Sequence, residues 1–164
     1  MAIHFRQFRI KFFGLMPLML LFFISFNGNS IVDLKFFTIN IMYILVYFWT
    51  LRQPDVFGYG LIFISGLITD VVYGLPMGVS SLSFLTIAGV AAYVRFVTVR
   101  ITLLNDWISF IPALLITNLV YFISLYASDY SISYLYIFTN SVFTFISYPI
   151  FWGIFTALLN IIKN

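Results

Sequence analysis

The sequence contains no cysteine, no glutamate, a single histidine and little charge of either sign. The lack of cysteine excludes disulfides, cysteine-ligated metals and thiol catalysis. Charged residues make up 8% of the chain, whereas a soluble domain usually carries about 25%. So few charges cannot cover a water-facing surface, and a soluble domain is therefore excluded. His4 lies in a polar leading segment, and we interpret it as a flanking residue and not as a ligand.

The residues that are present are mostly apolar. Of the 164 residues, 63% are hydrophobic and 21% are aromatic. Since about 20 apolar residues cross the roughly 30 Å hydrocarbon core of a bilayer, this length accommodates about six spans joined by short loops. We therefore expect an all-α integral membrane protein, a compact bundle of about six transmembrane helices that forms a single domain, residues 1–164. The expected spans are residues 12–26, 36–50, 56–73, 77–94, 107–127 and 134–162.

The first apolar segment has two interpretations. It follows Arg6, Arg9 and Lys11, as the apolar part of a signal peptide would. Residues 27–30, however, offer no small-residue cleavage pattern of the Ala-x-Ala kind. We therefore interpret residues 12–26 as a retained span.

The basic residues predict the orientation of the spans. An amino terminus in the cytoplasm leaves only Lys35 outside, and by the positive-inside rule both termini are then cytoplasmic. The basic residues placed inside are Arg6, Arg9, Lys11, Arg52, Arg95, Arg100 and Lys163. The main alternative, a bundle of about five spans, would put Lys163 outside. Basic residues that flank apolar runs singly do not form a phosphate-binding groove, so we expect no nucleic-acid binding.

One carboxyl group lies inside an expected span. Asp70 stands near the outer end of residues 56–73, where a charged residue is costly unless it faces the protein interior or a wet cavity. Ile62, Gly66 and Asp70 recur every four residues, so they share one face of the helix. Gly66 on that face permits a neighbouring helix to approach closely. The spacing predicts that Asp70 faces inward.

A turn rich in glycine and proline follows Asp70. The segment between Gly74 and Gly78 has no charge, and Pro76 suits the first turn of the next helix. Such a turn directs the free N–H groups and the positive end of that helix toward Asp70. Three interpretations of Asp70 remain open: a structural residue of a hairpin, a partner-binding or conformational residue, and a proton or ion relay.

Catalysis is not expected. The sequence has no HExxH, no GxSxG and no phosphate-cradling glycine loop, and no cofactor or metal site is indicated. Four further aspartates are expected in loops on alternating sides of the membrane, namely Asp33, Asp55, Asp106 and Asp129. The amides and hydroxyls within the spans are expected to form hydrogen bonds between helices. These residues are Asn40, Asn118, Asn140, Thr144 and Ser147.

The region around Asp70 resembles a known family. Arg52-Gln-Pro54-Asp55 precedes a helix that ends in Gly66-Leu67-x-x-Asp70, and Gly74-x-Pro76-x-Gly78 follows. This pattern is similar to the G-L-x-x-D-x-x-x-G-x-P-x-G signature of the MreD family of bacterial rod shape-determining membrane proteins. All positions of the signature are met, over about 30 residues of the chain, and the length and the expected spans agree with the family.

The resemblance implies a non-enzymatic scaffold of the cell-elongation machinery in the bacterial inner membrane. The implied partners are MreC, as the direct contact, and a RodA-type glycosyltransferase, its class B penicillin-binding transpeptidase and MreB filaments in the same complex. The implied structural or partner-contacting residues are Gly66, Asp70, Gly74, Pro76 and Gly78. Two alternatives remain: a substrate-capture subunit of a vitamin transporter, and an ion-coupled carrier built around Asp70. The first is disfavoured because residues 12–26 offer only Gly14 and Ser25 as small docking residues, and the second because inverted repeats are lacking.

Overall fold

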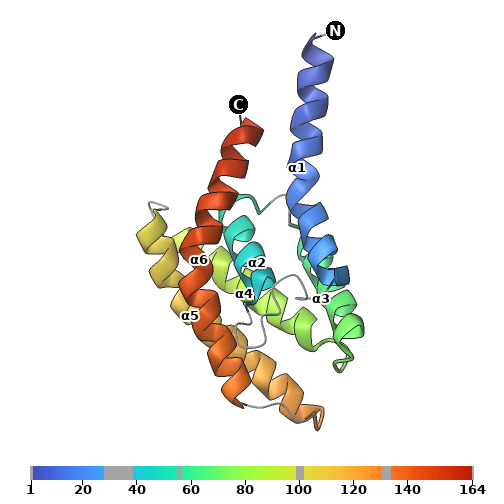
Figure 1. Cartoon of the computed structure of the whole chain (residues 1–164), viewed down its shortest axis with the longest axis vertical. Helices are drawn as coiled ribbons and strands as arrows, with labels where there is room; N and C mark the ends of the chain where they lie inside the picture. Colours follow the sequence, from blue (N-terminus) through green and yellow to red (C-terminus); the bar gives the residue numbers. More distant parts are fainter. Residues whose placement is uncertain (1, 28–38, 55–56, 99–101, 131–133, 164) are drawn as a thin grey trace.

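The structure, a computed structural model, describes residues 2–27, 39–54, 57–98, 102–130 and 134–163, and within these ranges the side chains of 15–27, 39–54, 57–98, 102–130 and 135–160. All secondary structure in these residues is helical, which confirms the all-α prediction (Figure 1). The helices are α1 (Ala2–Asn27), α2 (Ile41–Arg52), α3 (Tyr59–Tyr73), α4 (Val79–Val97), α5 (Leu103–Ala127) and α6 (Tyr134–Lys163).

Helix α2 lies at the centre of the molecule and is enclosed by the other helices (Figure 1). Every residue from Met42 to Leu51 is buried, and α2 packs against α1, α4 and α6. A helix that is apolar on all sides has no polar face to turn to water, so burial throughout its length is the stable arrangement. Its 12 residues measure only about 18 Å, which is shorter than the bilayer core.

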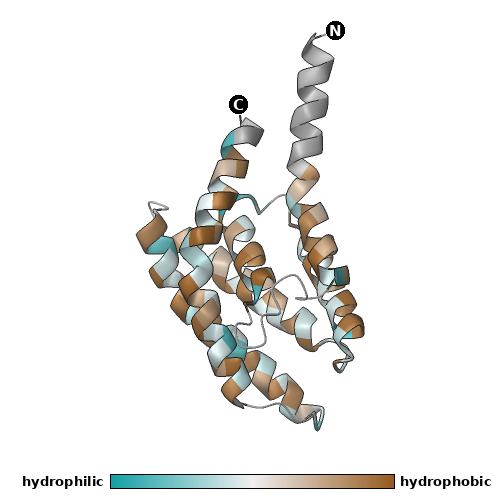
Figure 2. Cartoon of the chain, in the orientation of Figure 1, coloured by the Kyte–Doolittle hydropathy of each residue, from teal (hydrophilic) through white to brown (hydrophobic). Residues whose placement is uncertain are grey.

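Three helices are long and apolar enough to cross a membrane: α4, α5 and the part of α6 from Leu135 to Asn160. The stretch of α1 from Leu15 to Asn27, where the side chains are described, is apolar but shorter, and so are helices α2 and α3. Hydrophobic residues, coloured brown in Figure 2, recur along the long helices, and many of the large ones are exposed. On α5, for example, Leu115 is 66% exposed, and on α6 Ile150 is 67% exposed. Apolar surface of this extent fits a lipid environment better than water.

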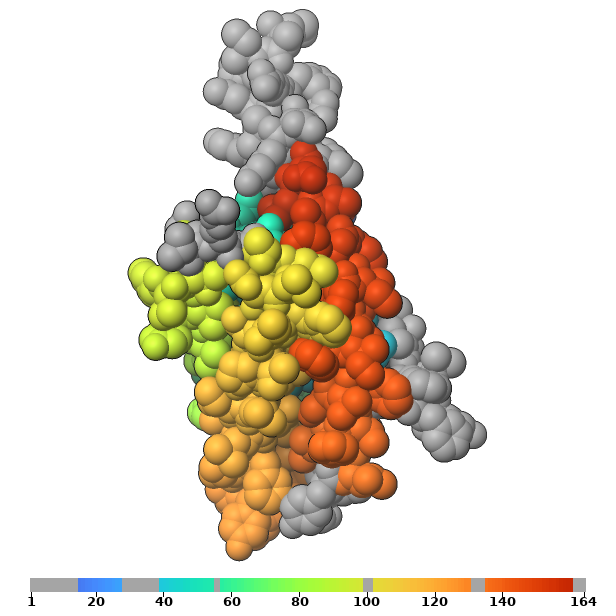
Figure 3. Space-filling model, turned by 90° about the vertical axis from the view of Figure 1, so that its left-hand side faces the viewer, coloured from blue at the N-terminus to red at the C-terminus, as the bar shows by residue number. Residues whose placement is uncertain are grey.

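The helices pack against one another in one bundle. Helix α3 packs on α4 and α1, α4 packs on α5 and α2, and α5 lies beside α6 on one face of the molecule (Figure 3). The first turn of α1 and the last turn of α6 lie at the same end (Figure 1). The α3–α4 turn, the last turn of α5 and the first turn of α6 lie at the opposite end (Figure 1). Hereafter, the end with the α3–α4 turn is called the hairpin end.

Several expected helix ends are wrong. Helix α4 begins at Val79, so Pro76 precedes the helix and is not part of its first turn. Helix α5 begins at Leu103 after the cap Thr102, so Asp106 lies in the first helical turn and not in a loop. Asp129 follows α5, in a left-handed backbone conformation with φ of 51°. The expected loop positions of Asp33 and Asp55 lie outside the described residues.

Candidate functional site

Asp70 caps the neighbouring helix α4. Its side chain is fully buried in the last turn of α3, and its two carboxyl oxygens accept hydrogen bonds from α4. The backbone N–H of Gly78 donates to Oδ2 at 2.7 Å, and that of Ser80 donates to Oδ1 at 2.9 Å. These are short bonds of the charge-assisted kind found at helix amino termini. The predicted inward orientation of Asp70, and the direction of the N–H groups toward it, are confirmed.

Gly78 explains why the cap comes from another helix. A helix usually receives its first side-chain acceptor from its own cap residue, which accepts from the second or third N–H of the helix. Gly78 is the cap residue of α4 and has no side chain, and its backbone is left-handed with φ of 101°. Asp70 therefore supplies, from α3, the acceptor that α4 lacks.

The turn between the two helices uses its glycines in a left-handed conformation. Gly74 ends α3 with φ of 64°, a conformation that costs side chains with a Cβ atom about 1–2 kcal/mol. The N–H of Leu75 then reaches back to the carbonyl of Asp70 at 2.9 Å. This bond closes the helix in the manner of a glycine-terminated helix end. The backbone of Asp70 thus closes α3, while its side chain caps α4.

Gly66 lies where α3 and α4 approach each other most closely. A Cβ atom added at Gly66 would lie 2.3 Å from the Cα of Ser81, a distance that real Cβ atoms do not adopt. The hydroxyl of Ser81 donates to the carbonyl of Phe63 at 3.0 Å, which joins the two backbones at the same level. The predicted close approach at Gly66 is therefore confirmed. We name Gly66, Asp70, Gly74, Pro76 and Gly78 together the Asp70 hairpin.

The structure contains a second polar cluster, which the sequence did not reveal. Asp106 is 1% exposed and pairs with Arg52 at the end of α2, with 3.1 Å between Nη2 and Oδ2. The indole Nε1 of Trp152 on α6 donates to the same oxygen at 3.0 Å. The Arg52 guanidinium also lies over the rings of Phe48 and Trp152, 5.2 and 5.3 Å from their centroids. We call Arg52, Asp106 and Trp152 the Asp106 cluster.

The Asp106 cluster joins three helices at the end of the molecule opposite the hairpin. Its members come from α2, α5 and α6, so a single carboxyl group connects elements that are far apart in the sequence. One sequence signal was available, because Thr102 followed by Asp106 is typical of a helix amino terminus. That signal predicts the helix start and not the partner of Asp106. Two charges in an apolar interior are tolerated here because the carboxyl group is both paired and hydrogen-bonded.

The expected hydrogen bonds between helices are present for some of the polar residues. Asn118 on α5 donates from Nδ2 to the hydroxyl of Ser141 on α6 at 2.8 Å. The backbone N–H of Asn40 donates to the hydroxyl of Thr144 at 2.9 Å, and the Asn40 side chain caps α2 by accepting from Tyr43. Asn40 is therefore a cap residue and not part of a span.

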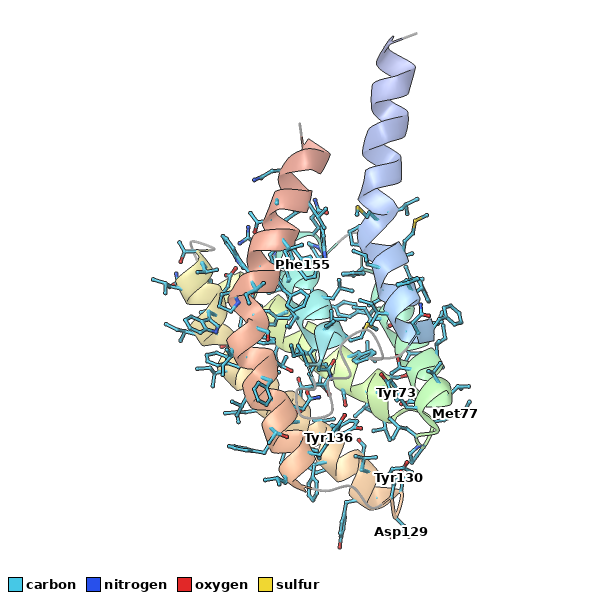
Figure 4. The ribbon with its side chains drawn as sticks, in the orientation of Figure 1. Tyr73, Met77, Asp129, Tyr130, Tyr136 and Phe155 are labelled. Carbon is cyan, nitrogen blue, oxygen red and sulfur yellow. The ribbon has the colours of Figure 1, made fainter. Side chains whose placement is uncertain are left out.

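A cavity of about 480 Å³ lies at the hairpin end. All six helices or their ends contribute to its lining, and tyrosine is its most frequent residue. Tyr73 of α3, Tyr130 after α5 and Tyr136 of α6 approach this region from three sides (Figure 4). Ser80, whose N–H binds Asp70, also lines the cavity, so the cavity adjoins the Asp70 hairpin. Within the described residues, no group of three or more metal-binding side chains is present.

No family model, curated protein or solved structure matches the chain. The function is therefore inferred from the residues and their geometry.

Proposed function

We propose that this protein is a non-enzymatic scaffold of the MreD type in the cell-elongation complex of the bacterial inner membrane. The observation that carries the proposal is the Asp70 hairpin. The glycines and the aspartate of the family-like signature each have a geometric role there: Gly66 permits the close approach of α4, Asp70 caps it, and Gly74 and Gly78 adopt left-handed conformations. A pattern whose residues jointly build one local structure is less easily explained by chance than scattered identities.

The hydrogen bonds already made by the Asp70 carboxyl group support a scaffold function over an ion-carrier function. Both of its oxygens are occupied by backbone N–H groups, and its side chain is fully buried. A relay residue needs an acceptor that is free to take up the transported proton or ion. Asp70 instead fixes the geometry of the turn, where Met77 is 75% exposed and available to a partner. The interpretation of Asp70 as a structural residue that shapes a partner surface is therefore preferred.

The proposed topology has six spans, with both termini in the cytoplasm. It is supported by the excess of basic residues on one side and by the position of the first turn of α1 and the last turn of α6 at the same end (Figure 1). The short α2 does not contradict six spans, because it is enclosed by other helices and its length is not matched against lipid. In this topology the Asp70 hairpin lies on the outer side and the Asp106 cluster on the cytoplasmic side.

The proposed direct partner is MreC, and the RodA-type glycosyltransferase, the class B penicillin-binding transpeptidase and MreB belong to the same complex. A protein made of helices and short connections must bind partners largely in the plane of the membrane. The exposed apolar faces of α5 and α6 offer surface for such contacts.

Depletion of the protein tests this proposal. Rod-shaped cells should become round and swell before lysis, since lateral wall insertion loses its organiser, and the tagged protein should recover MreC from a detergent extract. Cells that carry only Asp70→Ala should lose MreC recovery, while the matched control Asp129→Asn, at an exposed position, should retain it. Normal rod shape and unchanged lateral incorporation of wall precursor after depletion would contradict the proposal.

The cavity at the hairpin end favours one alternative function, a substrate-capture subunit that binds a vitamin. Its volume of about 480 Å³ lies within the range of roughly 300–1,000 Å³ typical of small-molecule sites. Saturable binding of a free vitamin to the purified protein, together with failure to recover MreC, would favour this alternative over the scaffold.

A further inference from the structure

The cavity at the hairpin end is lined by apolar side chains and by neutral polar side chains that can both donate and accept hydrogen bonds. Five tyrosines contribute to it, namely Tyr43, Tyr73, Tyr121, Tyr130 and Tyr136. Three asparagines are added from α5, α6 and the start of α2, namely Asn118, Asn140 and Asn40. Hydroxyls and carboxamides of this kind match ligands that themselves carry many hydroxyl groups, and aromatic rings offer flat apolar faces beside them.

The described lining contains no charged side chain. The carboxyl group of Asp70, whose hydrogen-bond donor Ser80 lines the cavity, is directed to the N–H groups of Gly78 and Ser80 through both oxygens. Tyr121, one of the lining tyrosines, lies within electrostatic reach of Tyr136, Asp70 and Tyr130. A charged ligand would find no counter-charge among the described lining residues.

A second hollow adjoins this cavity and is almost entirely apolar. It has a volume of about 440 Å³ and lies between α5 and α6. Asn118 and Ile137 line both hollows, so the two hollows adjoin at these residues. The two polar side chains of the apolar hollow, Asn118 and Ser141, are hydrogen-bonded to each other at 2.8 Å. The remaining lining is aliphatic or aromatic and continues into the apolar outer faces of α5 and α6.

We propose that the two hollows together form a binding site for a membrane lipid with an uncharged polyhydroxylated headgroup, such as a glycosyl lipid. The headgroup occupies the tyrosine and asparagine cavity, and an acyl chain lies in the apolar hollow between α5 and α6. A lipid is preferred to a free solute because an apolar hollow adjoins the cavity, with Asn118 and Ile137 in the lining of both. This inference does not depend on the scaffold function proposed above.

The experiment uses the full chain in nanodiscs of phosphatidylethanolamine and phosphatidylglycerol. Diglucosyl diacylglycerol is titrated in, and native mass spectrometry counts the lipids that remain bound. Phosphatidylglycerol and phosphatidylcholine with the same acyl chains test the headgroup, and free maltose tests binding without a chain. We expect one retained glycolipid per chain, bound at least about tenfold more tightly than either phospholipid, which corresponds to about 1.4 kcal/mol.

Two pairs of variants locate the site. Tyr121→Phe combined with Asn140→Leu removes polar groups from the cavity and should weaken glycolipid binding about tenfold, while Tyr93→Phe, at a position 68% exposed on α4, should not. Val142→Trp fills the apolar hollow and should also reduce retention, whereas Ile150→Trp, on the same helix outside the hollow, should not.

The comparison of lipids on the wild-type protein decides the proposal even if a variant fails to fold. Equal retention of glycolipid and phospholipids would overturn it, as would a preference for the choline headgroup. Binding of free maltose as tight as that of the glycolipid would overturn the lipid assignment. Selective retention of the glycolipid that depends on both hollows would support it.

Discussion

Replacement of Asp70 by asparagine should destabilise the protein, although the two side chains have nearly the same size. The Asp70 oxygens accept one N–H each, at 2.7 Å from Gly78 and 2.9 Å from Ser80. A carboxamide has one oxygen, so one of these N–H groups would face an NH₂ group and lose its acceptor, at a cost of about 1–3 kcal/mol. Loss of the negative charge at the amino terminus of α4 adds up to about 2 kcal/mol. The free energy of unfolding should therefore fall by about 1–5 kcal/mol.

Asp70→Ala removes both acceptors and should cost about 1–3 kcal/mol more than Asp70→Asn. The matched control is Asp129→Asn, because Asp129 is exposed and asparagine tolerates its left-handed backbone well. Thermal unfolding midpoints of the purified proteins in one detergent, with helix content checked by circular dichroism, should rank wild type and Asp129→Asn first, Asp70→Asn next and Asp70→Ala last. A wild-type midpoint for Asp70→Asn, or equal midpoints for the two Asp70 variants, would refute the double-acceptor reasoning.

The remaining predictions use the same unfolding assay. Gly66→Ala should lower the free energy of unfolding by about 3 kcal/mol or more, because its Cβ would lie 2.3 Å from a backbone atom of α4. Gly89→Ala, with no atom within 4 Å of the added Cβ, should be neutral or slightly stabilising, and equal losses in the two variants would contradict the close approach. Gly74→Ala should cost about 1–2 kcal/mol, through its left-handed backbone alone. Asp106→Ala should lower the free energy of unfolding by about 3–5 kcal/mol, because it leaves the charge of Arg52 unpaired. The double variant Arg52→Met with Asp106→Leu should lower it by less, since no unpaired charge remains. A double variant as unstable as Asp106→Ala would be evidence against this ion-pair account.

Local patterns in the sequence predicted the all-α class and the geometry around Asp70. The hydrogen bonds of the Asp70 side chain connect residues only eight and ten positions apart. Because these residues are so close in the sequence, the four-residue repeat of Gly66 and Asp70 and the glycines of the turn leave few possible geometries for the α3–α4 turn. The start of α4 was misplaced because Pro76 suits a first helical turn by itself, whereas the left-handed Gly78 puts the cap two residues later.

The tertiary structure alone decided which distant residues meet. Arg52 and Asp106 are 54 positions apart, and Trp152 is 46 positions beyond Asp106. An apolar run predicts a helix but not its neighbours, so nothing in the periodicity indicated which helices would surround α2 or that Asp106 would find a counter-charge. The cavity and the adjoining apolar hollow are likewise lined by residues that are far apart in the sequence, among them Asn118 of α5 and Ile137 of α6. Packing between helices depends on side-chain shape over the whole bundle, and hydrophobic periodicity does not contain that information.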